Sequence, residues 1–470
     1  MMGINFILKR CIIEKNFTFC SFNGTIVPLY STSWLVHMAT LLQQLQSCVI
    51  DDVPIPCDEN TKKWTFREKL SQKNAVFFRQ LVKNHHLLSF EYSVHCTQLA
   101  ADLLRKAPSV VTEQIKTALV MSELLEHLYR HYLNVPREVL RLRREQETYR
   151  QLLNLQGYTC AGRISPSYGT STTSKMIRDK TAETNWPRLL TLRLRRLLLL
   201  IAPVVVGCDG YRRVVEGVDQ YVGPVVPYIS WIFFGPRLIT NLFLTAKHLF
   251  PGAWMGERER SLDWQTRLGA QMERRWFELG NDSAWFTAGL INCFVLIGVL
   301  APVTLYVGVA MQAFDVFLAS VRAGLEISRM KKLEEKYECL LKMSSNDPIE
   351  HERIEGYLFH LRQRITHEKK RLYLSVLNNC VLLLAVTLFL PIFAFNPVIP
   401  LIGAVLAVLI TILNFSAIKY LESTRPKDKL QKIATAETPL VKHGFFSTPT
   451  VSDSSLEKDE IYNDMAVSIA

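Results

Sequence analysis

The sequence predicts an all-α, multi-pass membrane protein with an N-terminal helical domain and a cytoplasmic helical hairpin between its spans. The 470 residues are 49% hydrophobic and only 21% charged, and two long stretches carry no charged side chain, Ser283–Phe314 and Leu372–Ile418. The net charge of +12 is concentrated beside these stretches, as the positive-inside rule describes for membrane proteins. A nucleic-acid binder would instead gather its basic residues on one face or in a recognised motif, so we expect no nucleic-acid partner.

The N-terminal region divides into three parts by its pattern. Residues 1–60 have no clear periodicity and no signal peptide, because charged side chains interrupt any apolar core. Residues 61–160 predict a soluble helical domain, in which Pro108 separates the first two helices and Pro136 opens a third. Residues 161–187 are rich in serine, threonine and glycine and predict a linker. Ten scattered cysteines without a CxxC pair indicate a reducing, cytoplasmic setting.

Residues 188–314 form the first membrane region, in which we expect a span near 285–310. This span lies in the uncharged stretch Ser283–Phe314, which suits one long or tilted helix because about 20 residues cross the hydrocarbon core. A second apolar segment, residues 222–244, contains Arg237, and an arginine at the centre of a span costs about 2.5–3.5 kcal/mol. Topology must therefore decide whether this segment spans the membrane.

Residues 376–418 predict a transmembrane hairpin. The uncharged stretch is long enough for two spans, and Asn396, Pro397 and Pro400 supply the turn between them. Residues 419–470 follow as a polar segment without an apolar stripe, and we expect a disordered tail there.

Four spans would place every net-basic flank and both termini in the cytoplasm. Only the loop Lys247–Asp282, in which acidic and basic side chains balance, would then lie on the opposite side. Three spans would carry the helical domain across the membrane without a signal peptide. The sequence therefore favours four spans in the bacterial inner membrane, with a host membrane after secretion as the alternative location.

The segment 315–375 predicts an antiparallel, coiled-coil-like helical hairpin that projects into the cytoplasm. Asp347 is a suitable N-cap for its second helix, and Pro348 is a suitable first helical residue. An apolar stripe follows along this helix: Ile354, Leu358, Leu361 and Ile365. We interpret the stripe either as the seam of a self-packed spacer or as a docking face for a partner helix, which makes these four residues the candidate interaction face.

Two further patterns concern contacts with lipid and with other helices. Trp264 and Trp276 share one face of a predicted amphipathic helix, and tryptophan prefers the headgroup zone. We expect interfacial anchors at these positions, or a face that packs on the protein itself. Gly403 and Ala407 form a small-xxx-small step at which another helix can approach closely.

A search for chemistry finds none of the motifs GxSxG, GxxxxGK[ST], GxGxxG or HExxH. His127 and His131 share a helix face with Glu123, but the sequence offers no cluster of further ligands. His85 and His86 are adjacent and should point to different faces of a helix. We therefore expect no enzyme, no metal site and no bound cofactor.

Three segments between residues 221 and 335 carry a resemblance: YISWIFFGPRLITNLFLTAKHLFPGAWM (Tyr228–Met255), RRWFELGND and WFTAGLINCFVLIGVLAPV. They are similar to a group of uncharacterised multi-pass membrane proteins from Legionella-type intracellular bacteria. The resemblance implies a bacterial source, and it carries no known activity, ligand or active-site residue.

Three functions fit these observations. The first is a scaffold or interaction protein of the bacterial inner membrane, whose partners are the lipid bilayer and an unidentified protein bound through the hairpin or the helical domain. The second is a type IV secreted effector inserted in a host membrane, which the acidic segment Ser452–Asp464 ahead of a small, apolar end favours. The third is a channel or transporter, which the lack of acidic residues and histidine within the clear spans disfavours.

Overall fold

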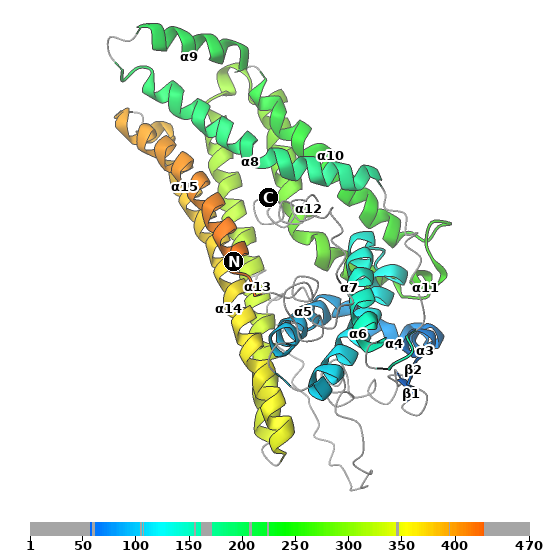
Figure 1. Cartoon of the computed structure of the whole chain (residues 1–470). Coiled ribbons are helices and arrows are strands. Elements are labelled where there is room, and N and C mark those ends of the chain that lie inside the picture. The colour runs from blue at the N-terminus through cyan, green and yellow to red at the C-terminus, as the bar shows by residue number, and fades with distance from the viewer. Residues whose placement is uncertain are drawn as a thin grey trace, which may run out of the picture.

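The structure is a computed structural model, and it describes residues 57–58, 62–103, 106, 108–154, 157–160, 172–205, 209–222, 225–344, 347–393 and 395–426. Over these residues the chain folds into thirteen α-helices, α3 to α15, and one antiparallel pair of two-residue strands (Figure 1). The expected all-α class is confirmed at this level. Most of the expected N-terminal segment and tail, residues 1–56 and 427–470, lies outside the described residues.

The N-terminal domain packs five helices around one core. Its elements are β1 (Cys57–Asp58), β2 (Lys63–Trp64), α3 (Phe66–Gln72), α4 (Ala75–Lys83), α5 (His85–Asp102), α6 (Pro108–His131) and α7 (Pro136–Asn154). α6 and α7 begin at the two prolines that the sequence marks as helix starts, because the fixed φ of proline suits the first turn of a helix. Leu119, Leu124 and Leu128 of α6 are buried in the core, where α6 packs on α5 and α7.

Two buried glutamates on α6 hold other helices of the domain. Glu123 pairs with Arg150 of α7. Glu126 pairs with Arg67 of α3 and with Arg143 of α7, each at 2.9 Å. Since a buried charge is tolerated only when it is paired, these contacts fix α3 and α7 to α6.

The rest of the described chain consists mainly of long helices. They are α8 (Thr172–Ile201), α9 (Asp209–Val222), α10 (Val226–Leu249), the short α11 (Glu257–Arg260), α12 (Trp264–Phe294), α13 (Val303–Met343), α14 (Pro348–Thr387) and α15 (Val398–Ser423). α8 packs on α10, α10 on α12, α12 on α13, α13 on α14, α14 on α15 and α15 on α8. Six helices thus close into a ring, with α13 and α14 as its longest antiparallel pair (Figure 1).

Two of the described helices are long and apolar enough to cross a membrane. The most apolar windows of α13 and α15 have mean hydropathies of 1.5 and 2.6. Only 17% and 33% of these windows are buried inside the protein, whereas the core helix of a soluble protein would be mostly buried. The structure therefore supports a helical protein with two helices of membrane-spanning character.

The single span expected over Ser283–Phe314 is wrong, because the chain turns back within it. α12 ends and α13 begins on either side of a turn that contains the short 3-10 helix η2 (Gly298–Leu300). Gly298 adopts a φ of +61°, which glycine tolerates, and Pro302 supplies a fixed φ from which α13 starts. The uncharged stretch is therefore the apex of a helical hairpin, in which α12 packs on α13.

The expected placement of Lys247–Asp282 on the membrane side opposite the helical domain is also wrong. Side chains of this segment contact the domain directly: Arg258 donates a hydrogen bond to His127 at 2.6 Å, and Asp263 pairs with Arg79 at 2.8 Å. Acidic and basic residues balance in this segment, so its charge gave no topological signal.

Two boundaries differ from those expected. The linker predicted over 161–187 is shorter, because α8 already begins at Thr172 and continues through Pro187. α15 ends at Ser423, inside the region 419–470 for which the sequence predicts a disordered tail. In both places a helix extends beyond the apolar residues that predict its boundary.

α10 covers most of the ambiguous segment 222–244, and its arginine is paired. Arg237 Nε donates a hydrogen bond to Asp282 Oδ2 of α12 at 2.7 Å, and the Asp282 side chain is fully buried. One turn further along α10, Asn241 donates a hydrogen bond to Glu278 at 3.2 Å. A seam of polar contacts therefore joins α10 to α12 and compensates for the burial of Arg237.

The hairpin expected over 315–375 is formed by the end of α13 and the start of α14, and we call it the arm. Asp347 Oδ1 accepts a hydrogen bond from the Glu350 backbone N–H at 3.4 Å and so caps α14. Helices of 41 and 40 residues are about 60 Å long, which is about twice the thickness of a hydrocarbon core of about 30 Å.

Gly403 sets the closest approach between α14 and α15. A Cβ at this position would lie 2.7 Å from the Ala385 carbonyl oxygen and 3.0 Å from the Leu388 Cβ. Ala407, one turn later, is also buried. The small-residue step therefore packs α15 on α14 of the same chain.

We predict that Gly403→Ala lowers the stability of the fold by about 1–3 kcal/mol, because the added methyl forces α15 away from the α14 backbone. Gly308→Ala in α13 is the matched control, since the same methyl there meets open space and alanine favours a helix. Thermal unfolding of the full chain in detergent micelles, followed by circular dichroism, measures both. Equal melting temperatures for the two variants would contradict the close approach.

We predict that Asp282→Asn destabilises the protein by about 3–5 kcal/mol, because it leaves the buried Arg237 guanidinium without its counter-charge. The double variant Arg237→Met/Asp282→Leu removes both charges and should recover most of the loss. The same thermal unfolding measurement applies. If the double variant is as unstable as the single one, shape rather than charge pairing determines this contact.

Candidate functional site

The candidate site is the junction between the helical domain and the long helices. α4 packs on α12 there, and α5 packs on α14. A hollow of about 400 Å³ opens at this junction, lined among others by Lys83 at the end of α4, Glu273 and Trp276 on α12, and Arg329 on α13. Charged side chains from three separate elements therefore converge in one place.

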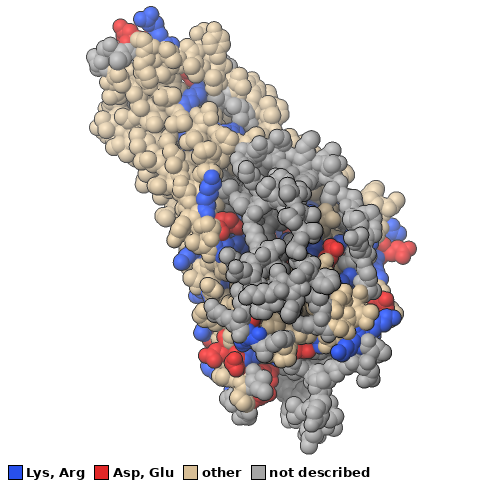
Figure 2. All heavy atoms as spheres, in the orientation of Figure 1, with Lys and Arg blue, Asp and Glu red and all other residues tan. Residues whose placement is uncertain are grey.

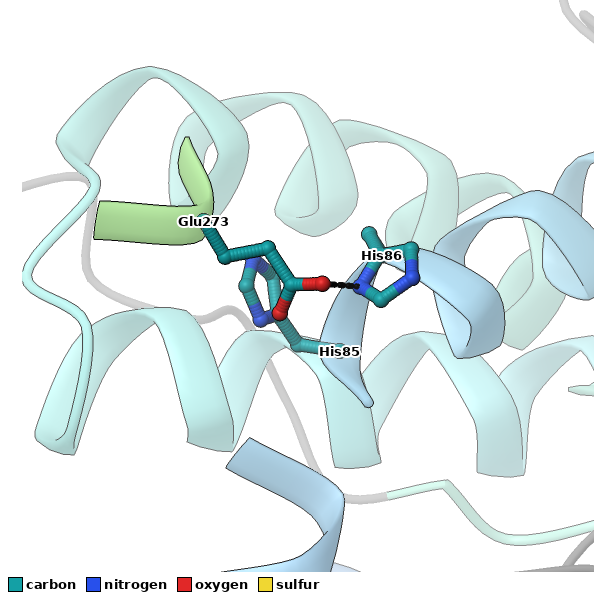
Figure 3. Close-up of side chains that lie close together, drawn as sticks. All are labelled: His85, His86 and Glu273. Carbon is teal, nitrogen blue, oxygen red and sulfur yellow. Dashed lines mark ion pairs between the residues drawn. The ribbon is translucent and has the colours of Figure 1, made fainter. Parts of the chain in front are cut away.

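His85, His86 and Glu273 come together beside this hollow. Figure 3 shows the Glu273 carboxylate lying between the two imidazole rings. One possible ligand atom from each residue lies within 4.8 Å of the other two, and Glu273 Oε1 is 3.5 Å from His86 Nδ1. The rings of the two histidines are nearly perpendicular, with centroids 5.8 Å apart. Their different directions, which the sequence predicts, let them approach one carboxylate from two sides.

Burial favours the neutral form of both histidines. Desolvation lowers the pKa of His85 to about 3 and the pKa of His86 to about 4, and the positive charge of Arg329 adds to both shifts. His85 Nδ1 lies 2.9 Å from the Val82 carbonyl oxygen. Because a carbonyl can only accept, this contact assigns the ring proton to Nδ1 and leaves Nε2 with a free lone pair.

Glu273 is held from the other side by Arg329. Arg329 Nη2 lies 2.5 Å from Glu273 Oε1. Partial burial raises the pKa of Glu273, and the pairing with Arg329 opposes that rise. The carboxylate thus links α5, α12 and α13, and two neutral imidazoles beside it form a set of donors suited to a cation.

The candidate interaction face is buried in the arm. Ile354, Leu358, Leu361 and Ile365 pack with residues of α13, and their exposed fractions are between 0% and 7%. Val94 of α5 belongs to the same cluster, so the arm also rests on the helical domain. The stripe is therefore the seam of the arm, and it is covered in this structure.

The two tryptophans expected to be interfacial anchors lie on the half of α12 that begins beside the helical domain. Trp264 is exposed at the start of α12, and Trp276 lines the hollow at the junction. This half of α12 packs on α4. The arrangement corresponds to a helix packed on its own protein, the second of the two interpretations that the sequence allows.

The second pair of histidines makes different contacts. His127 accepts a hydrogen bond from Arg258 at 2.6 Å and stacks on Phe78, with ring centroids 4.7 Å apart. His131 lies beside it, with centroids 4.6 Å apart, while Glu123 is buried and pairs with α7 instead. Within the described residues, the only group of three potential metal ligands is the one at His85, His86 and Glu273.

Sequence reasoning missed Glu273 as the third member of this group. It lies on α12, far from the histidines along the chain, and its spacing from them carries no motif. Only the packing of α4 and α5 against α12 and its neighbours brings it to them. No signal in the sequence alone could have selected it from the other glutamates.

No family model, curated protein or solved structure matches this chain. The resemblance to multi-pass membrane proteins of Legionella-type bacteria, and the bacterial source that it implies, therefore stays a prediction.

We predict that the protein loses up to about 2 kcal/mol of stability between about pH 7 and about pH 5 because of His127. Desolvation, aided by the charges of His131 and Arg258, lowers its pKa from 6.5 to about 3. The unfolded chain therefore binds a proton first as the pH falls below about 6.5, which favours unfolding. Protonation in the folded state would also oppose the hydrogen bond from Arg258.

Chemical denaturation of the full chain at several pH values measures this effect. His127→Gln is the test variant, because glutamine can accept the bond from Arg258 but does not titrate in this range. Its stability should depend less on pH than that of the wild type. The same pH dependence in both proteins would show that other groups cause it.

Proposed function

We propose that this chain is an integral membrane protein that holds its helical domain against one membrane surface and serves there as a scaffold or interaction protein. The observation that carries the proposal is the separation of apolar and charged surface along the molecule. Figure 2 shows a largely uncharged upper half and a lower half with many charged residues. The upper half contains the upper parts of the long helices of Figure 1.

The apolar end exposes large side chains that water would solvate poorly. Val299, Ile392 and Phe395 at the turns are 96%, 70% and 81% exposed. Ile239 and Phe243 on α10 are 65% and 66% exposed. Apolar surface in water costs about 25 cal/mol per Å², and large exposed apolar patches mark membrane or protein contacts. A lipid bilayer removes this cost over the whole end.

The turns of two hairpins, α12–α13 and α14–α15, lie at this apolar end (Figure 1). Each helix pair would therefore enter and leave the bilayer from the side of the helical domain. The arm turn at Asp347 and the end of α15 would lie on that same side. We assign that side to the cytoplasm, because the ten cysteines are scattered along the sequence without a CxxC pair and the chain carries a net charge of +12.

The alternatives have less support. A channel or transporter would need free polar groups along its path, whereas Arg237 is paired with Asp282, and Asp315 accepts a hydrogen bond from Trp285 at 3.0 Å. A secreted effector would use the same architecture in a host membrane. The sequence feature that favours this alternative, the acidic segment Ser452–Asp464, lies outside the described residues.

We further propose that the function of the protein is structural rather than catalytic.

We predict that an epitope inserted at Gly256 lies on the same side of the membrane as one inserted at Met343, at the end of α13. An epitope inserted at Phe395 should be inaccessible from that side. Protease protection of the full chain in oriented membrane vesicles measures all three, and Gly256 is a suitable position because it faces open space. Opposite sides for Gly256 and Met343 would contradict this topology, and release of the chain by alkaline carbonate would contradict membrane integration.

A further inference from the structure

We propose that His85, His86 and Glu273 bind one divalent transition-metal cation, with Zn²⁺ as the best match, and that the cation fastens the helical domain to α12. The site lies in the junction and outside the apolar end, so it does not depend on the proposed membrane function.

The three side chains supply a ligand set that zinc uses. Two histidine nitrogens and one carboxylate oxygen form the protein part of many zinc sites, with a fourth position left for water. Ligand atoms around a tetrahedral Zn²⁺ are about 3.3 Å apart, as follows from bonds of about 2.0–2.1 Å. The atoms here lie within 4.8 Å of one another, so side-chain rotations that bring them closer by at most about 1.5 Å would close the site. Two imidazoles favour zinc over Mg²⁺ or Ca²⁺.

The surroundings of the two histidines resemble those of metal ligands. His85 donates its Nδ1–H to the Val82 carbonyl at 2.9 Å, the outer contact that orients a histidine for binding through Nε2. His86 Nδ1 is buried, and its contact with Glu273 Oε1, at 3.5 Å, does not have the geometry of a hydrogen bond. A buried nitrogen without a hydrogen bond is costly, and a metal ion would satisfy it.

Arg329 is the group that competes with the cation. Its guanidinium lies 2.5 Å from Glu273 Oε1 and repels a second positive charge. The Arg329 side chain is 44% exposed, so it can turn toward the solvent when a cation binds. Removing this arginine should therefore strengthen metal binding. If the ion pair alone held these side chains together, its removal would only loosen them.

A bound cation would join the first residues of α5 to the middle of α12. This link would restrain the helical domain relative to the long helices, and the stabilisation would add to that of the ion pair between Arg79 and Asp263 at the same junction. The fourth coordination position would be left to water.

The experiment uses the full chain in detergent micelles, freed of metal with a chelator. Zn²⁺ titration by calorimetry should show one site per chain, and bound Zn²⁺ should raise the melting temperature. His86→Gln and Glu273→Gln should each weaken binding about tenfold or more, while Arg329→Gln should strengthen it. His131→Gln is the matched control, since it removes a histidine outside the site and should leave binding unchanged.

Co²⁺ spectroscopy identifies the ligands, because a site of nitrogen and oxygen donors lacks the intense thiolate absorption that cysteine ligands give. Circular dichroism of each variant establishes that it is folded. If His86→Gln does not fold, Glu273→Gln provides the test of the site. Two outcomes overturn the proposal. One is the absence of stoichiometric Zn²⁺ binding. The other is binding that survives both site variants and is lost when the cysteines are alkylated, which would mean adventitious thiolate binding only.

Discussion

The buried ion pair between Arg237 and Asp282 is the constraint on which the arrangement of the long helices depends. Burying Arg237 in an apolar helix alone would cost free energy, and so would burying Asp282 at the edge of an uncharged stretch. This desolvation cost falls when the two side chains form an ion pair. Their two-pronged contact, at 2.7 and 2.5 Å, fixes the register of α10 against α12. The contact between Asn241 and Glu278 repeats this restraint one turn further on. Both helices belong to the ring of six helices, in which α10 also packs on α8 and α12 on α13.

α12 transmits this register to the helical domain, because it is one uninterrupted helix of 31 residues. It packs on α10 and α13, while its first half also carries Asp263 to Arg79 and Glu273 to His86. The domain cannot turn relative to α12 without breaking these contacts. The position of Glu273 between the two histidines is thus a consequence of helix register, and it depends on residues far from the junction.

Local signals in the sequence predicted the all-α class, the helix starts at the two prolines and the arm with its cap, because each depends on neighbours within a few residues. Hydropathy could not distinguish one long span from a hairpin over Ser283–Phe314, because the same uncharged residues fit either structure. Only Gly298 and Pro302 indicated a turn. The pairs Arg237–Asp282 and His86–Glu273 join distant segments. Their spacing carries no information, so only the packed structure could reveal them.

If the protein lies in a membrane as proposed, the length of α12 explains why its charged pair is buried in protein. From Asp282 to the end of the helix at Phe294 there are about three turns, roughly 18 Å, which is less than a hydrocarbon core of about 30 Å. With the pair at the near surface, the turn at Gly298 would stop inside the hydrocarbon, where its backbone groups would find no water. With the turn at the far surface, the pair is drawn about 10 Å into the core. The arrangement with the turn at the far surface has the lower free energy, because the two buried charges neutralise each other between packed helices. In the other arrangement the turn, beside the exposed Val299, would have only lipid around it. In the proposed membrane topology, pairing would therefore allow so short a helix end to reach across the bilayer.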